Sequence, residues 1–388
     1  MKQFLLLLIA LASFTVACGG ASDNTNQAAY VTKLGNDTLA VEVFEKTETG
    51  MNAKVILRSP ETSFSSYKLT FDELGGIKTM VATRHSLEEG FGSAGDVLQS
   101  IVTTGDSLEV EMMWRGEVRT FMVEKEQGVL PFIDMVHWPF ELAFQNAKAA
   151  GVDTVNQPLL SGTRISNFII AEIRPDSMTL RHPSRGVMGT QVSESGHLEF
   201  LDAGLTTRKL KVYREPASSV NINALGKLFA RKDIAGNPFG ELSSAEENTY
   251  YIGDAEFVVS YGSPKKRGRD LFGGIVPWGE RWRTGANRAT HFYTSEDLTV
   301  GGVDMPAGEY TLFTIPQPDG GTLIINKQTG QNGRTYDESR DLVRVPMTIS
   351  SKSDITEAFT ITVEETDAGG SFNLIWGQTL FSVPFEIN

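Results

Sequence analysis

Residues 30–216 carry apolar side chains at every second position, in one short run after another. Leu39, Val41 and Val43 form one such run, and Phe168–Ile173 contains another. Clusters of Gly, Asp, Asn and Ser separate the runs. Successive side chains of a β-strand point to opposite faces, whereas those of a helix repeat about every 3.6 residues. The pattern therefore predicts an antiparallel domain of hairpins and meanders that forms a curved sheet.

One segment of this region breaks the alternation. His137–Ala150 has Pro139 near its start and Gly151 directly after its end, which is the asymmetry of an α-helix. Phe140 and Phe144 fall on the same face of that helix. We therefore expect one helix that covers the sheet.

The rest of the chain predicts a linker and a second β domain. Residues 217–249 form the linker, and helical spacing within it covers Val220–Lys232. Residues 250–388 contain a further series of short alternating runs, among them Ala255–Tyr261 and Gly308–Ile315, which predict a two-sheet β-sandwich. With 388 residues, of which 40% are hydrophobic, the chain has enough material for two cores.

The N-terminus has the features of an export signal. Lys2 precedes an apolar run, Phe4–Ala12, that is too short to span a bilayer as a folded helix. Small residues then lead to Cys18, the only cysteine. This order resembles a bacterial lipoprotein signal over residues 1–17, although Thr15 stands where leucine is usual. The alternative is an ordinary secretory signal with a chance cysteine.

In a lipoprotein, Cys18 would carry the lipid and anchor the protein to a membrane of the bacterial cell envelope, on the periplasmic face or the cell surface. Lipidation also explains a single thiol in an exported chain, where no other cysteine can pair with it. The polar residues 18–29 predict a flexible tether. The formal net charge of −13 argues against a nucleic-acid partner.

A basic segment stands out in this acidic chain. Residues 261–293 hold seven Lys/Arg, two Asp/Glu, six Gly, two Pro and two Trp, a composition that predicts loops. In a functional interpretation, arginines line an anion or carboxylate site and tryptophans offer flat faces to a sugar ring. In a structural interpretation, the arginines pair with carboxylates and the tryptophans fill the core.

Five residues in or beside this segment are our candidates for ligand binding. Arg283 and Asn287 flank a glycine turn at the start of a strand, and we favour them. Trp278 and Arg267 belong to the same segment, and His291 is the one histidine near it.

No sequence motif predicts a catalytic residue, a metal site or a cofactor. The histidines are scattered without metal-ligand spacing, and no P-loop or nucleophile elbow is present. In Thr206–Val212, charges alternate with apolar residues, which predicts an exposed strand without chemistry.

Several blocks of the second domain resemble the domain-of-unknown-function family 2911. These blocks are Tyr261–Pro264, Gly268–Pro277, Trp282–Asn287, Pro306–Ile315 and Leu380–Phe385. Two departures are Arg288, where an acidic residue is expected, and the pair Lys265-Lys266. The resemblance covers about residues 250–388 and implies an envelope β-domain, found mainly in secreted and lipoprotein-type proteins of Bacteroidetes-like bacteria. It implies no activity.

These observations favour a lipid-anchored, non-catalytic envelope protein that binds a small anionic or glycan-like ligand. The alternative is an envelope hydrolase with a site assembled by the fold around His291 and Arg283, with a carboxylate such as Asp304. An assembly module without a ligand is a third interpretation. The absence of nucleophile and metal motifs favours binding over catalysis.

Overall fold

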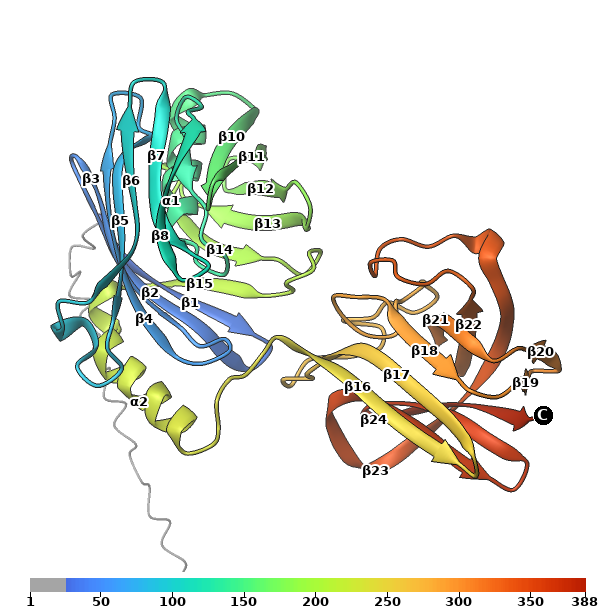
Figure 1. Ribbon diagram of the computed structural model, residues 1–388. Helices are drawn as coiled ribbons and strands as arrows, with labels where there is room; N and C mark the ends of the chain where they lie inside the picture. The colour runs from blue at the N-terminus through green and yellow to red at the C-terminus, as the bar shows by residue number, and fades with distance from the viewer. Residues whose placement is uncertain (1–25) are drawn as a thin grey trace, which may run out of the picture.

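The computed structural model describes residues 26–388 and divides them into two β-rich domains (Figure 1). The predicted signal at 1–17, Cys18 and most of the predicted tether lie outside the described residues. Within residues 26–388, no helix is long and apolar enough to cross a membrane. The mainly β fold expected from the alternation is confirmed.

The N-terminal domain is built on one curved sheet of 15 strands. Its strands are β1 (Gln27–Leu34), β2 (Asp37–Thr47), β3 (Gly50–Leu57), β4 (Ser63–Phe71), β5 (Ile77–His85), β6 (Asp96–Thr104), β7 (Ser107–Trp114), β8 (Glu117–Glu124), β9 (Leu130–Pro131), β10 (Thr154–Ser161), β11 (Arg164–Arg174), β12 (Ser177–His182), β13 (Gly186–Val192), β14 (Leu198–Asp202) and β15 (Lys211–Glu215). Strand β1 pairs with β2 on one side and with β15 on the other, so the two halves of the sheet meet there. All neighbours are antiparallel except β9 and β10, as the meander pattern predicts.

The predicted covering helix is α1 (Trp138–Ala150), and the sheet curls around it (Figure 1). Pro139 lies in its first turn, and Gly151 ends it in the left-handed conformation with φ of 64°, which glycine adopts without steric cost. Phe140 and Phe144 are buried in the core of this domain. The helix thus begins and ends where its local signals predict.

A carboxylate from the sheet caps the start of α1. Glu42, fully buried in the middle of β2, accepts the backbone N–H groups of His137 and Trp138 at 2.9 and 2.8 Å. These N–H groups have no partner inside the helix, and the N-terminal end of a helix carries partial positive charge. Glu42 therefore fixes α1 on the sheet.

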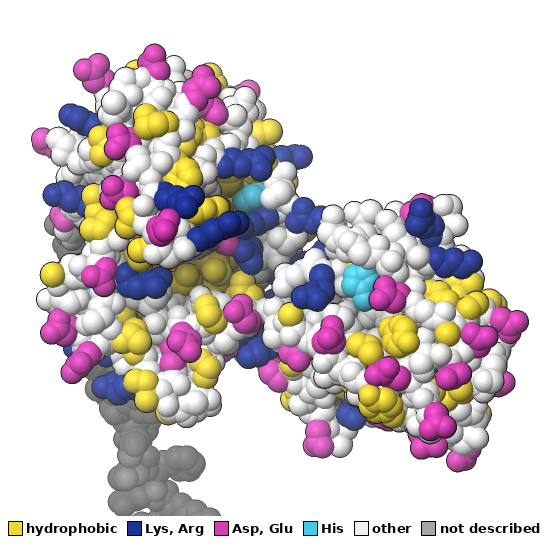
Figure 2. Space-filling model, in the orientation of Figure 1, with side chains coloured by type: hydrophobic (Ala, Val, Ile, Leu, Met, Phe, Trp, Pro, Cys, Tyr) yellow, Lys and Arg dark blue, Asp and Glu magenta, His cyan; other side chains and the backbone are white. Residues whose placement is uncertain are grey.

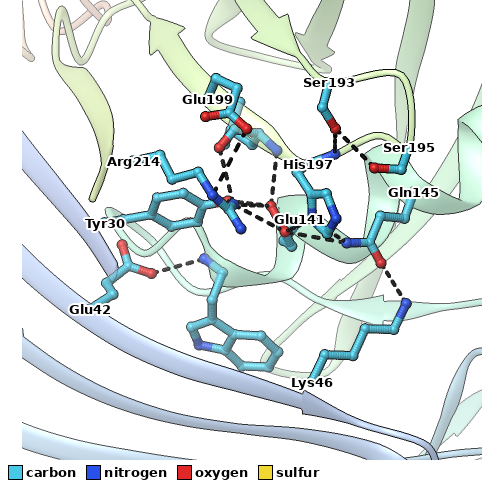
Figure 3. Close-up of polar contacts among 12 residues, drawn as sticks. Tyr30, Glu42, Lys46, Glu141, Gln145, Ser193, Ser195, His197, Glu199 and Arg214 are labelled. Carbon is cyan, nitrogen blue, oxygen red and sulfur yellow. Dashed lines mark hydrogen bonds and ion pairs between the residues drawn. The ribbon is translucent and has the colours of Figure 1, made fainter. Parts of the chain in front are cut away.

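A second buried carboxylate, in the first turn of α1, binds the helix to the sheet (Figure 3). Glu141 accepts hydrogen bonds from Tyr30 at 2.5 Å and from Arg214 at 3.1 Å, and it lies 2.6 Å from Nδ1 of His197. Burial raises the pKa of Glu141, but the contacts with His197 and Arg214 outweigh burial and hold that pKa below its usual value. The backbone N–H of Leu198 also donates to Glu141, so the network joins α1 to β1, β14 and β15.

The second helix, α2 (Ile222–Ile234), packs on the opposite face of the sheet and matches the helical spacing of the linker. Its Phe229 forms a small core with Ile56 and Phe64. A Cβ atom on Gly226 would lie 2.3 Å from the Phe64 ring, so only glycine permits this close packing. Central strands are consequently buried on both faces, which explains why β2 shows little exposed surface.

The C-terminal domain contains a nine-stranded, folded-over sheet. Its strands are β16 (Ser243–Ile252), β17 (Ala255–Pro264), β18 (Thr290–Thr294), β19 (Leu298–Val300), β20 (Val303–Met305), β21 (Gly308–Gln317), β22 (Gly320–Asn326), β23 (Asp341–Thr366) and β24 (Gly369–Ile387). The two long strands change register between Ser351 and Thr360, and they link the two layers of the predicted sandwich. One hydrophobic core fills the space between the layers. Its first strand, β16, begins at Ser243, within the stretch predicted as the linker.

Candidate functional site

The basic segment forms the loops between β17 and β18, at the face of the C-terminal domain that meets the N-terminal domain. Arg267 makes the main contact. Its side chain is 4% exposed, and Nη1 lies 2.8 Å from Oδ2 of Asp37 in the N-terminal domain. Its Nη2 donates to the carbonyl of Phe239, and its guanidinium lies 3.7 Å from the centre of the Phe239 ring. Arg267 therefore joins the domains, and its charge is already satisfied within the protein.

The backbone around Arg267 is part of the same joint. Asn36 donates its N–H to the Arg267 carbonyl at 2.9 Å. Gly35, with φ of 63°, lies so close that a Cβ atom there would be 2.0 Å from that carbonyl oxygen. The β1–β2 turn thus needs glycine at this position for the two domains to meet.

Beside this joint, the two domains enclose a cleft with a volume of about 800 Å³. Figure 2 shows Lys and Arg side chains, in dark blue, around the hollow where the two lobes meet. The basic residues that line the cleft are Arg185, Arg208, Lys209, Arg269, Arg283 and Arg334. Among residues 26–388, no Asp or Glu lines it. An electropositive cleft thus lies in a chain whose net charge is −13.

Two of these six cations share one counter-ion from the protein. Asp134 forms ion pairs with both Arg185 and Arg208, and Nη2 of Arg185 lies 3.2 Å from Oδ2 of Asp134. Burial raises the pKa of Asp134, but the two guanidiniums outweigh burial and hold that pKa below its usual value. One carboxylate therefore bridges one pair of cations.

The remaining four cations form no ion pair with any carboxylate among residues 26–388. Burial, and then the nearby Arg269 guanidinium, lower the pKa of Lys209, and Glu280 offsets this only in part. Burial and the charge of Arg267 lower the pKa of Arg269 to about 10. Glu357 and Asp37 raise the pKa of Arg269 but do not offset this lowering. Burial and the charge of Arg334 lower the pKa of Arg283. Like charges therefore lie near one another in the cleft, and no carboxylate of residues 26–388 forms an ion pair with them.

The turn that carries Arg283 and Asn287 is fixed by its backbone. Ala286 donates its N–H to the carbonyl of Gly262 at 3.0 Å, and Nη1 of Arg283 donates to the carbonyl of Asn287 at 3.2 Å. A Cβ atom on Gly262 would lie 1.9 Å from the Ala286 carbonyl oxygen. Asn287 adopts a φ of 63°, in the left-handed region that asparagine tolerates. Both favoured candidates line the cleft on this preformed turn.

The tryptophans of the segment have different environments. Trp282 lines the cleft together with Trp376, and their rings stack 6.1 Å apart with an angle of 9° between the planes. Trp278 lies outside the cleft lining and stacks on Phe272 instead. Trp282 is therefore the flat apolar surface of the segment that faces the cleft.

His291 also lies outside the cleft lining. It is on β18, where Nδ1 lies 3.3 Å from the Thr311 hydroxyl, and burial lowers its pKa. Asp304 is exposed on β20 and pairs in register with Thr299. Among the described residues, no hydrogen bond or ion pair joins His291 to Asp304 or to Arg283. No group of three or more His, Cys, Asp and Glu within residues 26–388 is placed to hold a metal ion.

Sequence reasoning missed the cations of the N-terminal domain. Residues 206–210 form a loop and only Lys211 begins β15, so the strand predicted over Thr206–Val212 is wrong in its first part. In this loop Lys209 has a φ of 52°, in the left-handed region. Its side chain therefore does not follow the alternation expected of a strand. Arg185 lies in another connection, between β12 and β13. No motif identifies these positions, because the other domain completes the cleft.

Comparisons with known proteins concern the C-terminal domain and the fold. No curated protein matches the chain. A crystal structure of a DUF1089 family protein from Pseudomonas aeruginosa matches with 11% sequence identity over 42% of this chain and 90% of that one, at a TM-score of 0.30. Residues 243–385 match the family described as a protein of unknown function (DUF2911). The C-terminal domain therefore carries the family domain that its motifs predict.

Proposed function

We propose that this protein is a lipid-anchored, non-catalytic protein of the bacterial cell envelope that binds a small anionic ligand in the cleft between its two domains. The observation that carries the proposal is the lining of the cleft, to which the described residues contribute six Lys/Arg and no Asp or Glu. Four of the six, Lys209, Arg269, Arg283 and Arg334, have no carboxylate partner in the described part of the chain.

Electrostatics supports an anionic ligand. Like charges close together in a partly buried cleft repel one another, which costs free energy. A bound anion would offset this repulsion and accept charge-assisted hydrogen bonds from the cations. Arginine suits this role because its planar guanidinium binds phosphate or carboxylate through two parallel hydrogen bonds. Trp282 offers an aromatic face beside these cations, which suits the ring of an anionic glycan.

Thermal shift of the purified full-length protein tests the binding site. We expect inorganic phosphate, sulfate and an acidic oligosaccharide to raise the melting temperature of the wild type, because a ligand that binds only the folded state stabilises it. Arg283→Ala should reduce the shift, while Arg164→Ala, which removes an exposed arginine on β11, should not. The proposal fails if no anion shifts the wild type.

The membrane anchor rests on the N-terminal pattern, with an apolar run before Cys18. In the native host we expect labelled palmitate to be incorporated into the wild type and to be lost in Cys18→Ala. A wild type that remains unlabelled would contradict lipidation and favour an ordinary secretory signal.

A further inference from the structure

We infer that the ligand of the cleft carries two separate anionic groups, one bound between Lys209 and Arg269 and the other between Arg283 and Arg334. This inference rests on the proposed anion-binding function and narrows the class of ligand. The two groups are phosphates or carboxylates carried on one molecule.

One carboxylate of the protein already forms ion pairs with two cations in this cleft. Arg185 and Arg208 come from different loops, and Asp134 bridges them. The other four cations line the same cleft, where the charge of Arg269 acts most strongly on Lys209 and that of Arg334 acts on Arg283. No carboxylate of residues 26–388 forms an ion pair with any of the four. A ligand with two anionic groups could therefore serve the two pairs as Asp134 serves Arg185 and Arg208.

The first pair spans the two domains. Lys209 belongs to the loop before β15, while Arg269 belongs to the basic segment of the C-terminal domain. Arg269 extends toward the N-terminal domain, since a Cβ atom on Gly35 would lie 2.8 Å from its Cγ. Carbonyl oxygens of Lys265 and Lys266 accept from its Nη2 and Nε, which fixes the guanidinium without neutralising it. An anion here would contact both domains.

The second pair lies entirely in the C-terminal domain. Gly333 packs against Arg283, because a Cβ atom on it would lie 2.8 Å from Arg283 Cδ, and Arg334 follows Gly333 directly in the chain. Arg334 is exposed, whereas Arg283 is half-buried on its fixed turn. Both pairs line one cleft, and Trp282 lines the same space.

Calorimetric titration of the full-length protein with defined phosphonates tests this inference. The probes are methylphosphonate and a series of α,ω-alkane diphosphonates with increasing spacer length. We expect one diphosphonate to bind the wild type about tenfold or more tightly than methylphosphonate, because a second set of charge-assisted hydrogen bonds forms only with two anionic groups. That spacer length would also report the separation of the two pairs.

Two variants that each disrupt one pair complete the test. Lys209→Ala and Arg334→Ala should each abolish the preference for the diphosphonate while keeping the binding of methylphosphonate at the intact pair. Lys78→Ala, which removes an exposed lysine on β5, should keep the preference. If methylphosphonate and every diphosphonate bind the wild type within about twofold of one another, the ligand needs one anionic group and the inference is overturned. If neither class binds at all, the proposed function itself fails.

Phosphorylated sugars, uronic-acid oligosaccharides and inorganic polyphosphates all share this chemistry. If the wild type binds a diphosphonate, titrations with tripolyphosphate and with a di-uronate oligosaccharide distinguish these ligand classes. Stronger binding of the oligosaccharide would favour a glycan, since only its sugar rings can stack on Trp282. We expect a Trp282→Leu variant to lose that advantage and to keep the affinity for tripolyphosphate.

Discussion

Arg267 of the C-terminal domain donates from Nη1 to the carboxylate of Asp37 in the N-terminal domain, with 2.8 Å between the nitrogen and Oδ2. The side chain of Arg267 is 4% exposed and that of Asp37 is 47% exposed, so the contact lies at the edge of the buried joint. This contact sets the domains side by side and thereby shapes the cleft.

Replacing Arg267 should loosen the joint. Arg267→Ala leaves Asp37 and the Phe239 carbonyl without their donor, and hydrogen bonds to charged groups contribute about 1.5–3 kcal/mol. We expect a loss of about 2 kcal/mol in the free energy of unfolding and a larger radius of gyration in solution scattering. Arg164→Ala is the matched control. Scattering identical to that of the wild type would show that Arg267 does not set the domain arrangement.

Glu42 should be essential for the position of α1. Glu42→Ala leaves the N–H groups of His137 and Trp138 buried without an acceptor, and each such group costs about 1–3 kcal/mol. Urea unfolding should show a loss of at least about 2 kcal/mol. Glu45→Ala, on the exposed end of the same strand, should change stability by less than about 0.5 kcal/mol. Equal effects of the two changes would refute the capping role.

Gly262 should be irreplaceable at the turn that carries Arg283 and Asn287. Gly262→Ala places a methyl group 1.9 Å from the Ala286 carbonyl oxygen, so the turn has to move. We expect lower stability and a weaker response to anions in thermal shift. Gly189→Ala is the control, because a Cβ atom at Gly189 meets nothing within 4 Å. Unchanged anion binding in Gly262→Ala would show that anion binding does not depend on the conformation of this turn.

The free energy of unfolding should fall at acid pH because Glu141 becomes protonated. Its pKa in the folded protein lies below the unfolded value of about 4.3, so its contribution is fully present above that pH and is lost as pH falls through the folded pKa. Glu141→Gln should therefore lower stability at neutral pH and flatten its decline toward about pH 3. Chemical unfolding across this range measures the effect. If the stability of Glu141→Gln declines with falling pH as steeply as that of the wild type, groups other than Glu141 cause the acid sensitivity.

The predictable parts of this molecule are those set by neighbours in sequence. Pro139 and Gly151 predict both ends of α1 because capping is a local effect. The alternation predicts strands for the same reason, although it does not reveal that α2 buries the outer face of β2. The family blocks identify the C-terminal domain, and the match to residues 243–385 confirms them.

The cleft depends on contacts between distant residues. Arg267 and Asp37 are separated by 230 positions, so composition alone does not distinguish an arginine that joins domains from one that faces a ligand. Arg283 and Asn287 were predicted from a local turn and do line the cleft. Lys209 lies in a loop whose role becomes visible only when the second domain faces it.

The measurement that tests the central claim most directly is a calorimetric titration of the full-length protein with pyrophosphate at low ionic strength. We predict binding to the wild type and to Lys78→Ala, with affinity reduced about tenfold in Lys209→Ala and lowered for all three proteins by added salt. Absence of binding to the wild type would contradict the assignment of the cleft as an anion site, and equal affinity of the three proteins would contradict the role of Lys209 in it.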